Sequence, residues 1–264
     1  MEILKIEGLC KKYPAFSLKD VSFSMESGTV MGFIGRNGAG KTTTLKSMLR
    51  LVHPDAGHVE ICGMDVAEQE LAVKAQIGFV TGSAAYYPRK RLGQLTAATR
   101  RFYPNWDEAR YQDCLRRFAL DEGKRVSELS EGMKVKYQLA LAMSHHAKLL
   151  ILDEPTSGLD PAARDDLLGL FLELVERDGA SVLFSTHITS DLDACADTIT
   201  YIRNGEIFAS EARRAFTERY RYLRADEAAV SPELAAKLIA PRRHQGEIEG
   251  LLRTADAPEA GGPA

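Results

Sequence analysis

The stretch Gly35-Arg36-Asn37-Gly38-Ala39-Gly40-Lys41-Thr42 matches the pattern G-x-x-x-x-G-K-[ST] at every fixed position. The apolar residues 29–34 before it predict a buried strand, and the apolar residues after it recur at helical spacing. This helical stripe consists of Leu45, Met48, Leu49 and Val52. Strand, glycine-rich loop and helix in this order turn backbone N–H groups and the positive end of the helix dipole toward one anion. The pattern therefore predicts a phosphate-binding loop rather than a glycine-rich turn that matches by chance.

Two side chains of this loop have specific predicted roles. Lys41 is expected to reach the β- and γ-phosphates of a nucleoside triphosphate, and the Thr42 hydroxyl is expected to ligate Mg²⁺. The residues of this segment expected to bind the nucleotide are Gly35, Arg36, Asn37, Gly38, Ala39, Gly40, Lys41, Thr42 and Thr43.

The overall composition is ordinary for a soluble globular protein. The 264 residues are 45% apolar and 27% charged, and a net charge of −3 gives no reason to expect a nucleic-acid partner. The four cysteines lie far apart without a C-x-x-C pair, so neither a zinc site nor a disulfide framework is expected. The opening residues turn polar too soon for a secretory signal, and no run of about 18 apolar residues follows. We therefore expect a cytosolic protein whose membrane part, if its process needs one, is another chain.

A second apolar run, residues 149–152, ends in two carboxylates. Asp153 and Glu154 follow it at the carboxyl end, where open parallel sheets bind their ligands. The alternative is that these acids only cap the next helix, but its expected start at Asp160-Pro161 lies six or seven residues further on. Asp153 is therefore predicted to hold Mg²⁺, and Glu154 is positioned to polarise an attacking water.

The remaining elements predict an α/β chain with one helical insertion. Further strands are predicted at 2–9, 17–26, 58–62, 77–80 and 181–186, and a short helix at 71–76. His187 directly follows the last of these strands, where both a structural and a catalytic role remain open. Residues 83–146 are mostly helical in pattern, with a helix start expected at Asn105 and Glu108. The apolar stripe of that helix consists of Tyr111, Cys114, Leu115 and Phe118.

In this order, the motifs resemble those of the ATP-binding cassette family, the nucleotide-binding subunits of ABC transporters. The stretch Leu129-Ser130-Glu131-Gly132-Met133 is similar to the signature that distinguishes this family from other phosphate-loop ATPases. The turn 157–160 and the run Ser185-Thr186-His187 also match, and the resemblance covers roughly residues 2–210. It implies an α/β P-loop NTPase cassette over residues 1–210, with a parallel core sheet, an antiparallel β subdomain and a helical subdomain inserted at about 83–146.

The resemblance also implies ATP and Mg²⁺ as ligands, a mechanism and partners. Two cassettes, identical or different, would close head to tail over two ATP molecules, with Ser130 and Gly132 of one protomer completing the other's site. Glu154 would activate the water, His187 would contact the γ-phosphate, and Asp160 would lie at the dimer seam. Hydrolysis would power a separately encoded transmembrane permease, with this chain in the cytoplasm on the inner face of the membrane.

Some positions depart from the family's pattern. The signature usually reads Leu-Ser-Gly-Gly-Gln, whereas Glu131 and Met133 stand here in place of a glycine and the glutamine. The strand 77–80 should be followed by a glutamine that contacts Mg²⁺, but Thr81-Gly82-Ser83 follows, in which Thr81 or Ser83 could hold a metal-bound water. Both departures resemble the bacterial branch that includes antibiotic-resistance and acetoin-utilisation-type exporters.

Two aromatic segments have two interpretations each. Tyr13 matches the family's adenine-stacking residue, but an aromatic beside a turn is also common at the rim of a core. Residues 86–91 lie where the family docks a helix of the membrane subunit, but the segment could equally be a solvated basic loop.

Beyond about residue 211 the family's motifs end. Residues 211–254 predict a small extension, in which strands at 220–224 and 248–252 flank a helix at 232–239, and residues 255–264 predict a disordered tail. The extension also carries a cluster of arginines and aromatics. A solvated or ion-paired face is the favoured interpretation, ahead of a surface for nucleic acid or anionic lipid. The cluster contains Arg213, Arg214, Arg219, Arg221 and Arg224 with Phe216, Tyr220 and Tyr222.

Two functions of other classes are also considered. A soluble ABC ATPase that acts on ribosomes or DNA would normally have two cassettes in one chain or a long coiled-coil insertion, and the sequence has neither. A nucleotide-responsive regulatory module with weak hydrolysis would be expected to lack Glu154 or His187, and the sequence has both.

Overall fold

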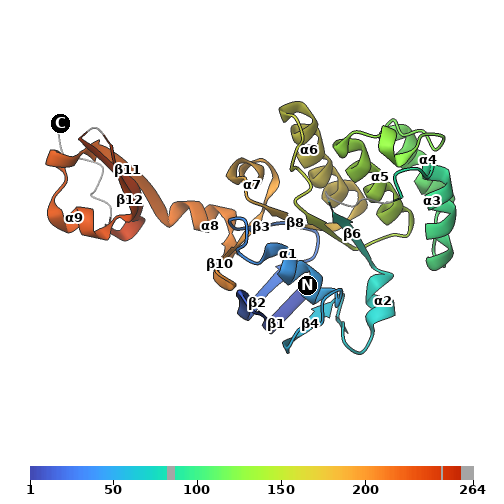
Figure 1. Cartoon of the computed structure of the whole chain (residues 1–264), viewed down its shortest axis with the longest axis horizontal. Helices are drawn as coiled ribbons and strands as arrows, with labels where there is room; N and C mark the ends of the chain where they lie inside the picture. Colours follow the sequence, from blue (N-terminus) through green and yellow to red (C-terminus); the bar gives the residue numbers. More distant parts are fainter. Residues whose placement is uncertain (82–86, 245, 257–264) are drawn as a thin grey trace. The chain divides into compact units, whose positions relative to one another are not determined.

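The computed structural model describes residues 1–81, 87–244 and 246–256 (Figure 1). The chain divides into two compact units, Met1–Ser210 and Glu211–Ala264. Among the described residues, no helix is both long enough and apolar enough to cross a lipid bilayer.

An antiparallel sheet at the start of the chain has the strand order β2-β1-β4-β5. Its strands are β1 (Glu2–Tyr13), β2 (Phe16–Glu26), β4 (Ala56–Ile61) and β5 (Met64–Asp65). Along β2, Val21, Phe23 and Met25 are buried and the residues between them are exposed, as the alternating sequence predicts. One face of this sheet therefore belongs to the core.

The central sheet has the strand order β10-β9-β3-β8-β7-β6. Its strands are β3 (Val30–Ile34), β6 (Ile77–Thr81), β7 (Leu149–Asp153), β8 (Ser181–Thr186), β9 (Thr198–Arg203) and β10 (Glu206–Ala212). Strand β3 pairs in parallel with β8 and β9, and β7 pairs in parallel with β6 and β8. Since the strands are parallel, the carboxyl ends of β3, β7 and β8 meet at one edge of the sheet.

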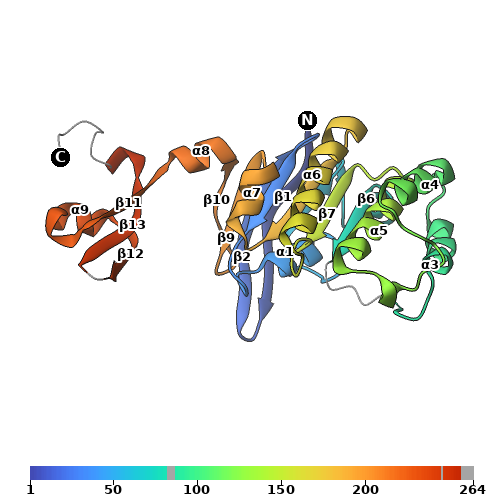
Figure 2. The same cartoon turned by 90° about the horizontal axis from the view of Figure 1, so that it is seen from above.

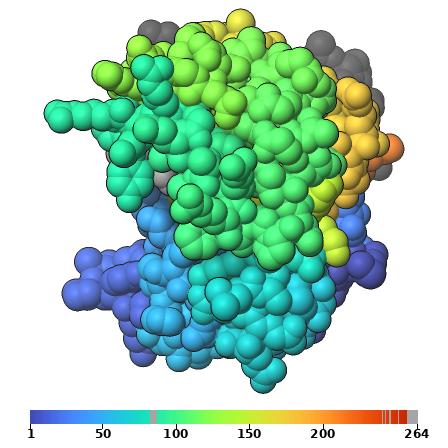
Figure 3. Space-filling model, turned by 90° about the vertical axis from the view of Figure 1, so that its right-hand side faces the viewer, coloured from blue at the N-terminus to red at the C-terminus, as the bar shows by residue number. Residues whose placement is uncertain are grey.

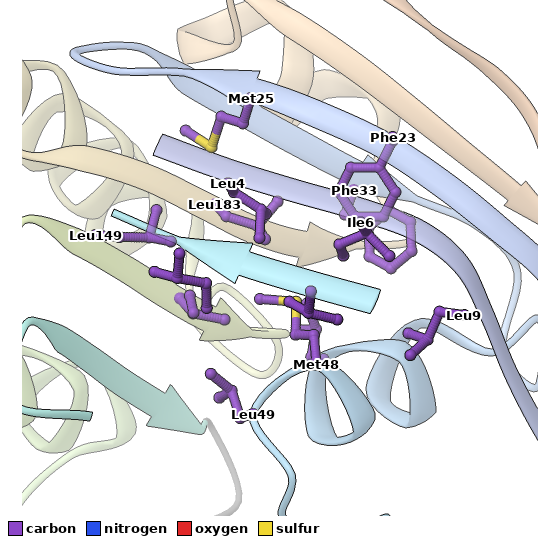
Figure 4. Close-up of a cluster of buried hydrophobic side chains, with 14 of the residues drawn as sticks. Leu4, Ile6, Leu9, Phe23, Met25, Phe33, Met48, Leu49, Leu149 and Leu183 are labelled. Carbon is purple, nitrogen blue, oxygen red and sulfur yellow. The ribbon is translucent and has the colours of Figure 1, made fainter. Parts of the chain in front are cut away.

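The main core lies between the two sheets. Helix α1 (Lys41–Met48) is sandwiched there, and α6 (Pro161–Asp178) and α7 (Thr189–Cys195) cover the other side of the central sheet (Figure 1). Figure 4 shows side chains from both sheets and from α1 converging in one cluster. The side chains of Leu45 and Met48 are fully buried, which stabilises the packed helix by about 2 kcal/mol each.

The helix after the phosphate loop is shorter than its apolar stripe predicts. It ends at Met48 because Arg50 adopts a φ of 53°, which the α-helix does not permit. The backbone N–H of Val52 then bonds the carbonyl of Lys46 at 3.1 Å, closing the helix end. The prediction that Val52 belongs to the helix is therefore wrong.

A helical segment lies between β6 and β7 in the sequence. It contains α3 (Leu92–Thr99), α4 (Glu108–Arg117) and α5 (Glu131–Ser144), with 3-10 turns at Arg100–Phe102 and Val126–Glu128. Figure 2 shows this segment beside β6, at the end of the central sheet, and Figure 3 shows the face that α3 and α4 present above α2 (Glu70–Lys74). The predicted stripe of α4 is buried, because Tyr111, Cys114, Leu115 and Phe118 are each at most 7% exposed.

The predicted start of α4 at Asn105 is wrong. Asp107 caps this helix instead, accepting the backbone N–H of Arg110 at 2.9 Å. Glu108, which would have completed a capping box with Asn105, accepts hydrogen bonds from Trp106 Nε1 and Gln112 Nε2. Its carboxylate is therefore occupied by neighbouring side chains.

The second unit contains a small antiparallel sheet of order β11-β13-β12. Its elements are α8 (Arg213–Glu218), β11 (Tyr220–Asp226), α9 (Pro232–Lys237), β12 (Ile239–His244) and β13 (Glu247–Arg253), with 3-10 turns at Glu227–Ala229 and Thr254–Asp256. Its small core contains Leu238, Ile248 and Leu252. The prediction of a helix as far as Ile239 is wrong, because Leu238 is already extended and Ile239 begins a strand.

Ion pairs occupy several of the arginines in this unit. Arg214 pairs with Glu218, Arg219 with Glu211, and Arg224 with Glu247. These contacts agree with the favoured interpretation of an ion-paired face. Residues 257–264, most of the predicted disordered tail, lie outside the described residues.

Candidate nucleotide-binding site

The phosphate loop joins β3 to α1. Gly40 stands directly before the helix with a φ of 113°, a conformation that favours glycine. A Cβ atom on Gly40 would lie 2.8 Å from side-chain atoms of both Leu18 and Phe16, so a larger residue would also have to displace these two side chains. Because the first four backbone N–H groups of a helix have no partner within it, the start of α1 can donate to an anion.

A cavity of about 550 Å³ opens at this loop, which is large enough for a nucleotide. Most of the predicted nucleotide-binding residues line it, together with Glu154 and His187 from the ends of β7 and β8. The lining residues are Ala15, Phe16, Arg36, Asn37, Gly38, Gly40, Lys41, Thr42, Thr43, Glu154, Ser157 and His187. Gly35 and Ala39 contribute differently, because the Gly35 carbonyl accepts from Lys41 and Ala39 is buried beneath the loop.

Lys41 is at the centre of the charged contacts in this cavity. Its side chain is 5% exposed, and its ammonium donates to the Gly35 carbonyl at 2.7 Å and lies 2.9 Å from a carboxylate oxygen of Glu154. The other carboxylate oxygen of Glu154 is 2.7 Å from Nδ1 of His187. A buried ammonium needs such partners, because an unpaired charge would be costly away from water. Glu154 thus connects the phosphate-loop lysine to the histidine.

Thr42 and Asp153 provide a set of oxygens suited to Mg²⁺. The Thr42 hydroxyl donates to one carboxylate oxygen of Asp153 at 2.8 Å, and the hydroxyl of Ser185 donates to the other at 2.7 Å. Hydroxyl and carboxylate oxygens are the ligand types that this hard cation prefers. The residues present therefore fit the predicted magnesium site.

Ser185 contributes contacts to the candidate site that the sequence reasoning missed. Besides contacting Asp153, its hydroxyl accepts the backbone N–H of Glu154 at 2.9 Å. Ser185 and Asp153 stand opposite each other in the β7–β8 ladder. The polar residues at the end of β8 were therefore the feature of the sequence that could have indicated this contact. Glu154 itself has a φ of 51°, an uncommon value for a residue with a side chain, and the Ser185 contact supports this backbone conformation.

The structure places Tyr13 apart from the lining of this cavity. Ala15 and Phe16 line it, whereas Tyr13 is 43% exposed at the end of β1, with the Lys11 ammonium 5.9 Å from its ring centre. The sequence reasoning missed Phe16, which lies just across the β1–β2 turn. Phe16 therefore lines the nucleotide cavity where Tyr13 does not, and an adenine contact by Tyr13 stays a prediction.

Ser130 of the signature and Asp160 act as helix caps within the chain. Ser130 precedes α5 and accepts the backbone N–H of Met133 at 3.2 Å, while Gly132 lies in the first turn of that helix. Asp160 caps α6 by accepting the backbone N–H of Ala163 at 2.9 Å, the local role expected of an acid before a helix. Neither Ser130 nor Gly132 is among the described residues that line the phosphate-loop cavity.

A second cavity, of about 500 Å³, adjoins the predicted magnesium site. Its lining residues are Thr42, Lys46, Thr81, Glu131, Asp153, Glu154 and Ser157. Glu131, the acid that replaces a signature glycine, therefore faces this cavity and pairs with Lys134 at 2.6 Å. Thr81 lines the cavity as well, whereas Gly82 and Ser83 lie outside the described residues.

Together these features define a phosphate-loop nucleoside triphosphatase. The family model for ABC transporters matches residues 18–157. The chain belongs to the ABC transporter ATP-binding family, whose cassettes hydrolyse ATP, and the resemblance and fold class expected from the sequence are confirmed.

Known relatives agree with this assignment. The ABC transporter ATP-binding protein YtrB of Bacillus subtilis (strain 168) is 31% identical, with 72% of this chain and 65% of YtrB covered. The Nod factor export ATP-binding protein I of Burkholderia lata is 34% identical, with 75% of this chain and 66% of that protein covered. The chain thus spans slightly less than two thirds of the length of these relatives. A solved ATP-binding subunit of an ABC transporter is 30% identical with a TM-score of 0.72, and the match covers 81% of this chain and 93% of that one.

Proposed function

We propose that this ATPase is the energising subunit of an exporter and acts on a separately encoded membrane-spanning subunit. The observation that carries the proposal is that Lys41, Glu154 and His187 line one cavity, with Glu154 in contact with both of the others. A module that only senses nucleotide has no need for a carboxylate and an imidazole placed together beside a phosphate loop. Export is the direction named for the Nod factor relative.

Each residue has a distinct part in hydrolysis. Thr42 and Asp153 would hold Mg²⁺ through their oxygens, and Lys41 would hold the phosphates. When bound, Mg²⁺ neutralises charge on the β- and γ-phosphates. Glu154 accepts the proton of the attacking water. His187 keeps the Glu154 carboxylate oriented through its Nδ1 contact and adds a hydrogen bond near the developing phosphate charge.

A second cassette completes the site in this proposal. Ser130 and Gly132 stand at the start of α5, where backbone N–H groups can donate to a phosphate. Since they do not line the phosphate-loop cavity of their own chain among the described residues, the phosphate they contact belongs to another protomer. Asp160, at the start of α6, lies at the seam of this dimer, which is formed by two identical or two related chains.

The membrane-spanning subunit binds at the helical segment. A cavity of about 360 Å³ lies between β6, α3 and α5, and two large exposed side chains, Tyr87 and Phe102, are among the residues that line it. Aromatic side chains at an exposed cavity are typical of interfaces. Tyr87 belongs to the predicted docking segment 86–91, of which residue 86 lies outside the described residues. In this arrangement the chain is peripheral on the cytoplasmic face of the membrane.

Crosslinking tests the transport assignment. A photo-crosslinking amino acid in place of Tyr87 should capture a protein with several apolar segments of about 20 residues. The same probe in place of Leu71, which is 85% exposed on α2 and does not line the cavity, is the matched control. Capture of no membrane protein, or equal capture from both positions, would reject the docking proposal while leaving the ATPase assignment intact.

A further inference from the structure

The end of β6 is held by a glutamine from the helical segment. The side-chain oxygen of Gln138 accepts the backbone N–H of Thr81 at 3.3 Å, and its side-chain nitrogen donates to the backbone carbonyl of Thr81 at 3.3 Å. The same nitrogen also donates to the carbonyl of Lys134, one turn earlier in α5. Gln138 is only 8% exposed, so this residue is buried with hydrogen bonds made by its carboxamide.

The Gln138 side chain takes the place of a neighbouring strand at the edge of β6. In the order of the central sheet β6 is the last strand, so among the described residues one of its edges has no neighbouring strand. A carboxamide has one acceptor oxygen and a donor nitrogen, as a peptide group does, and can bond both backbone groups of one residue. Gln138 therefore caps the exposed edge of β6 at Thr81, as a short strand would.

Thr81 and Gln138 connect two parts of the proposed ATPase site. Thr81 stands opposite Asp153 in the β6–β7 ladder and lines the cavity beside the magnesium site. Gln138 lies eight residues after Ser130, about 12 Å along α5. A shift of α5 relative to β6 would therefore change the geometry of the signature residues and of Thr81 together.

We propose that Gln138 is a positioning residue, which fixes the signature helix to the strand that adjoins the magnesium site. This inference rests on the proposed function, because its catalytic consequence requires Ser130 to act on a phosphate. The family usually has a glutamine after this strand, but Thr81 follows Val80 here. Gln138 instead reaches Thr81 from α5 of the helical segment. The link between the helical segment and the nucleotide site then depends on Gln138, while the phosphate loop binds ATP without it.

Two variants of the full chain test this role. Gln138→Ala removes both contacts with Thr81, so we expect the Thr81 amide to exchange with solvent at least about tenfold faster. We expect kcat for ATP hydrolysis to fall about tenfold, while the nucleotide Kd changes less than twofold, because no residue of the phosphate loop is altered. Gln138→Glu keeps an acceptor for the Thr81 amide but loses the donor. As pH falls and the introduced carboxyl is protonated, it regains a donor, so protection of Thr81 should rise toward the wild-type value.

Ser144→Ala is the matched control. Ser144 is a buried polar residue on the same helix, but its hydroxyl donates to Ala140 within α5. Unchanged exchange at Thr81 in Gln138→Ala, or a loss of kcat no larger than that of Ser144→Ala, would overturn the proposal. Amide exchange needs no turnover, so if the wild type failed to hydrolyse ATP, the proposed function would fail while the contact itself was still tested. If Gln138→Ala did not fold, the pH dependence of Gln138→Glu would decide.

Discussion

Replacing Glu154 by glutamine should affect ATP binding and ATP hydrolysis in opposite directions. Hydrolysis should slow and binding should become tighter. The Glu154 carboxylate contacts Lys41 at 2.9 Å and His187 at 2.7 Å. Glutamine has nearly the same shape and retains hydrogen-bonding capacity, but it has no charge and cannot accept a proton from water. We therefore expect the fold and the cavity to persist while the chemical step fails.

The two effects have different sizes. Removing a general base typically lowers the rate by about 10²–10⁴-fold, so kcat should fall by at least about 100-fold. Binding should become tighter, because a triphosphate has to compete with Glu154 for the Lys41 ammonium. Exposed ion pairs stabilise a fold by about 0–1 kcal/mol. Because the side chains of Lys41 and Glu154 are only 5% and 24% exposed, the free energy of their ion pair should lie modestly above that range. A gain of about 1.4 kcal/mol corresponds to about tenfold tighter binding.

Equilibrium titration with a fluorescent ATP analogue and a phosphate-release assay measure the two quantities. Glu131→Gln is the matched control, because it also removes a negative charge from the neighbouring cavity but does not touch Lys41. Turnover of Glu154→Gln within threefold of the wild type would refute the role of Glu154 as base. Nucleotide affinity equal to that of Glu131→Gln would refute competition for Lys41.

Three further predictions concern stability. Burial lowers the pKa of His145 to about 4, so at this residue the folded protein binds fewer protons than the unfolded chain. The stability of the fold should therefore fall as pH drops below about 6.5. In urea titrations, His145→Gln should remove about 2 kcal/mol of the stability loss between pH 7 and pH 5. Gly205→Ala should cost more than about 2 kcal/mol, because its Cβ would lie 1.9 Å from the Ser17 carbonyl oxygen, whereas Gly28→Ala, with nothing within 4 Å, should cost only about 1 kcal/mol for its positive φ. Asp107→Ala should lower the unfolding free energy by about 1 kcal/mol by removing the cap of α4, and Asp107→Asn should restore most of it.

The sequence predicts the parts of the site that follow from local pattern. Asp153 and Glu154 follow a buried apolar run and His187 follows a buried strand, and parallel strands bring such positions to the same edge. Spacing alone also indicated the loop that surrounds Lys41. These inferences needed no knowledge of long-range packing, because the direction of each strand and its burial decide where its carboxyl end lies.

The contacts that sequence reasoning missed depend on tertiary structure. Gln138 and Thr81 are 57 residues apart, and nothing in the helical pattern of α5 distinguishes Gln138 from a solvent-exposed residue. Phe16 lines the nucleotide cavity because of how the β1–β2 turn directs its side chain. The end of α1 depended on the positive φ of Arg50, an uncommon conformation that no residue type at that position signals.

Glu154 has competing demands that explain the arrangement around it. It must face the phosphates to act on water, although two like charges near each other repel, and its backbone has an uncommon positive φ. Ser185 supports this placement, since one hydroxyl bonds both the Asp153 carboxylate and the Glu154 backbone N–H. A triphosphate that takes Lys41 as its ligand leaves Glu154 with His187 as its remaining side-chain partner. In the proposed mechanism the carboxylate is thereby released from its cation at the step at which the attacking water needs a base, so nucleotide binding and activation of the base would be coupled through the same lysine.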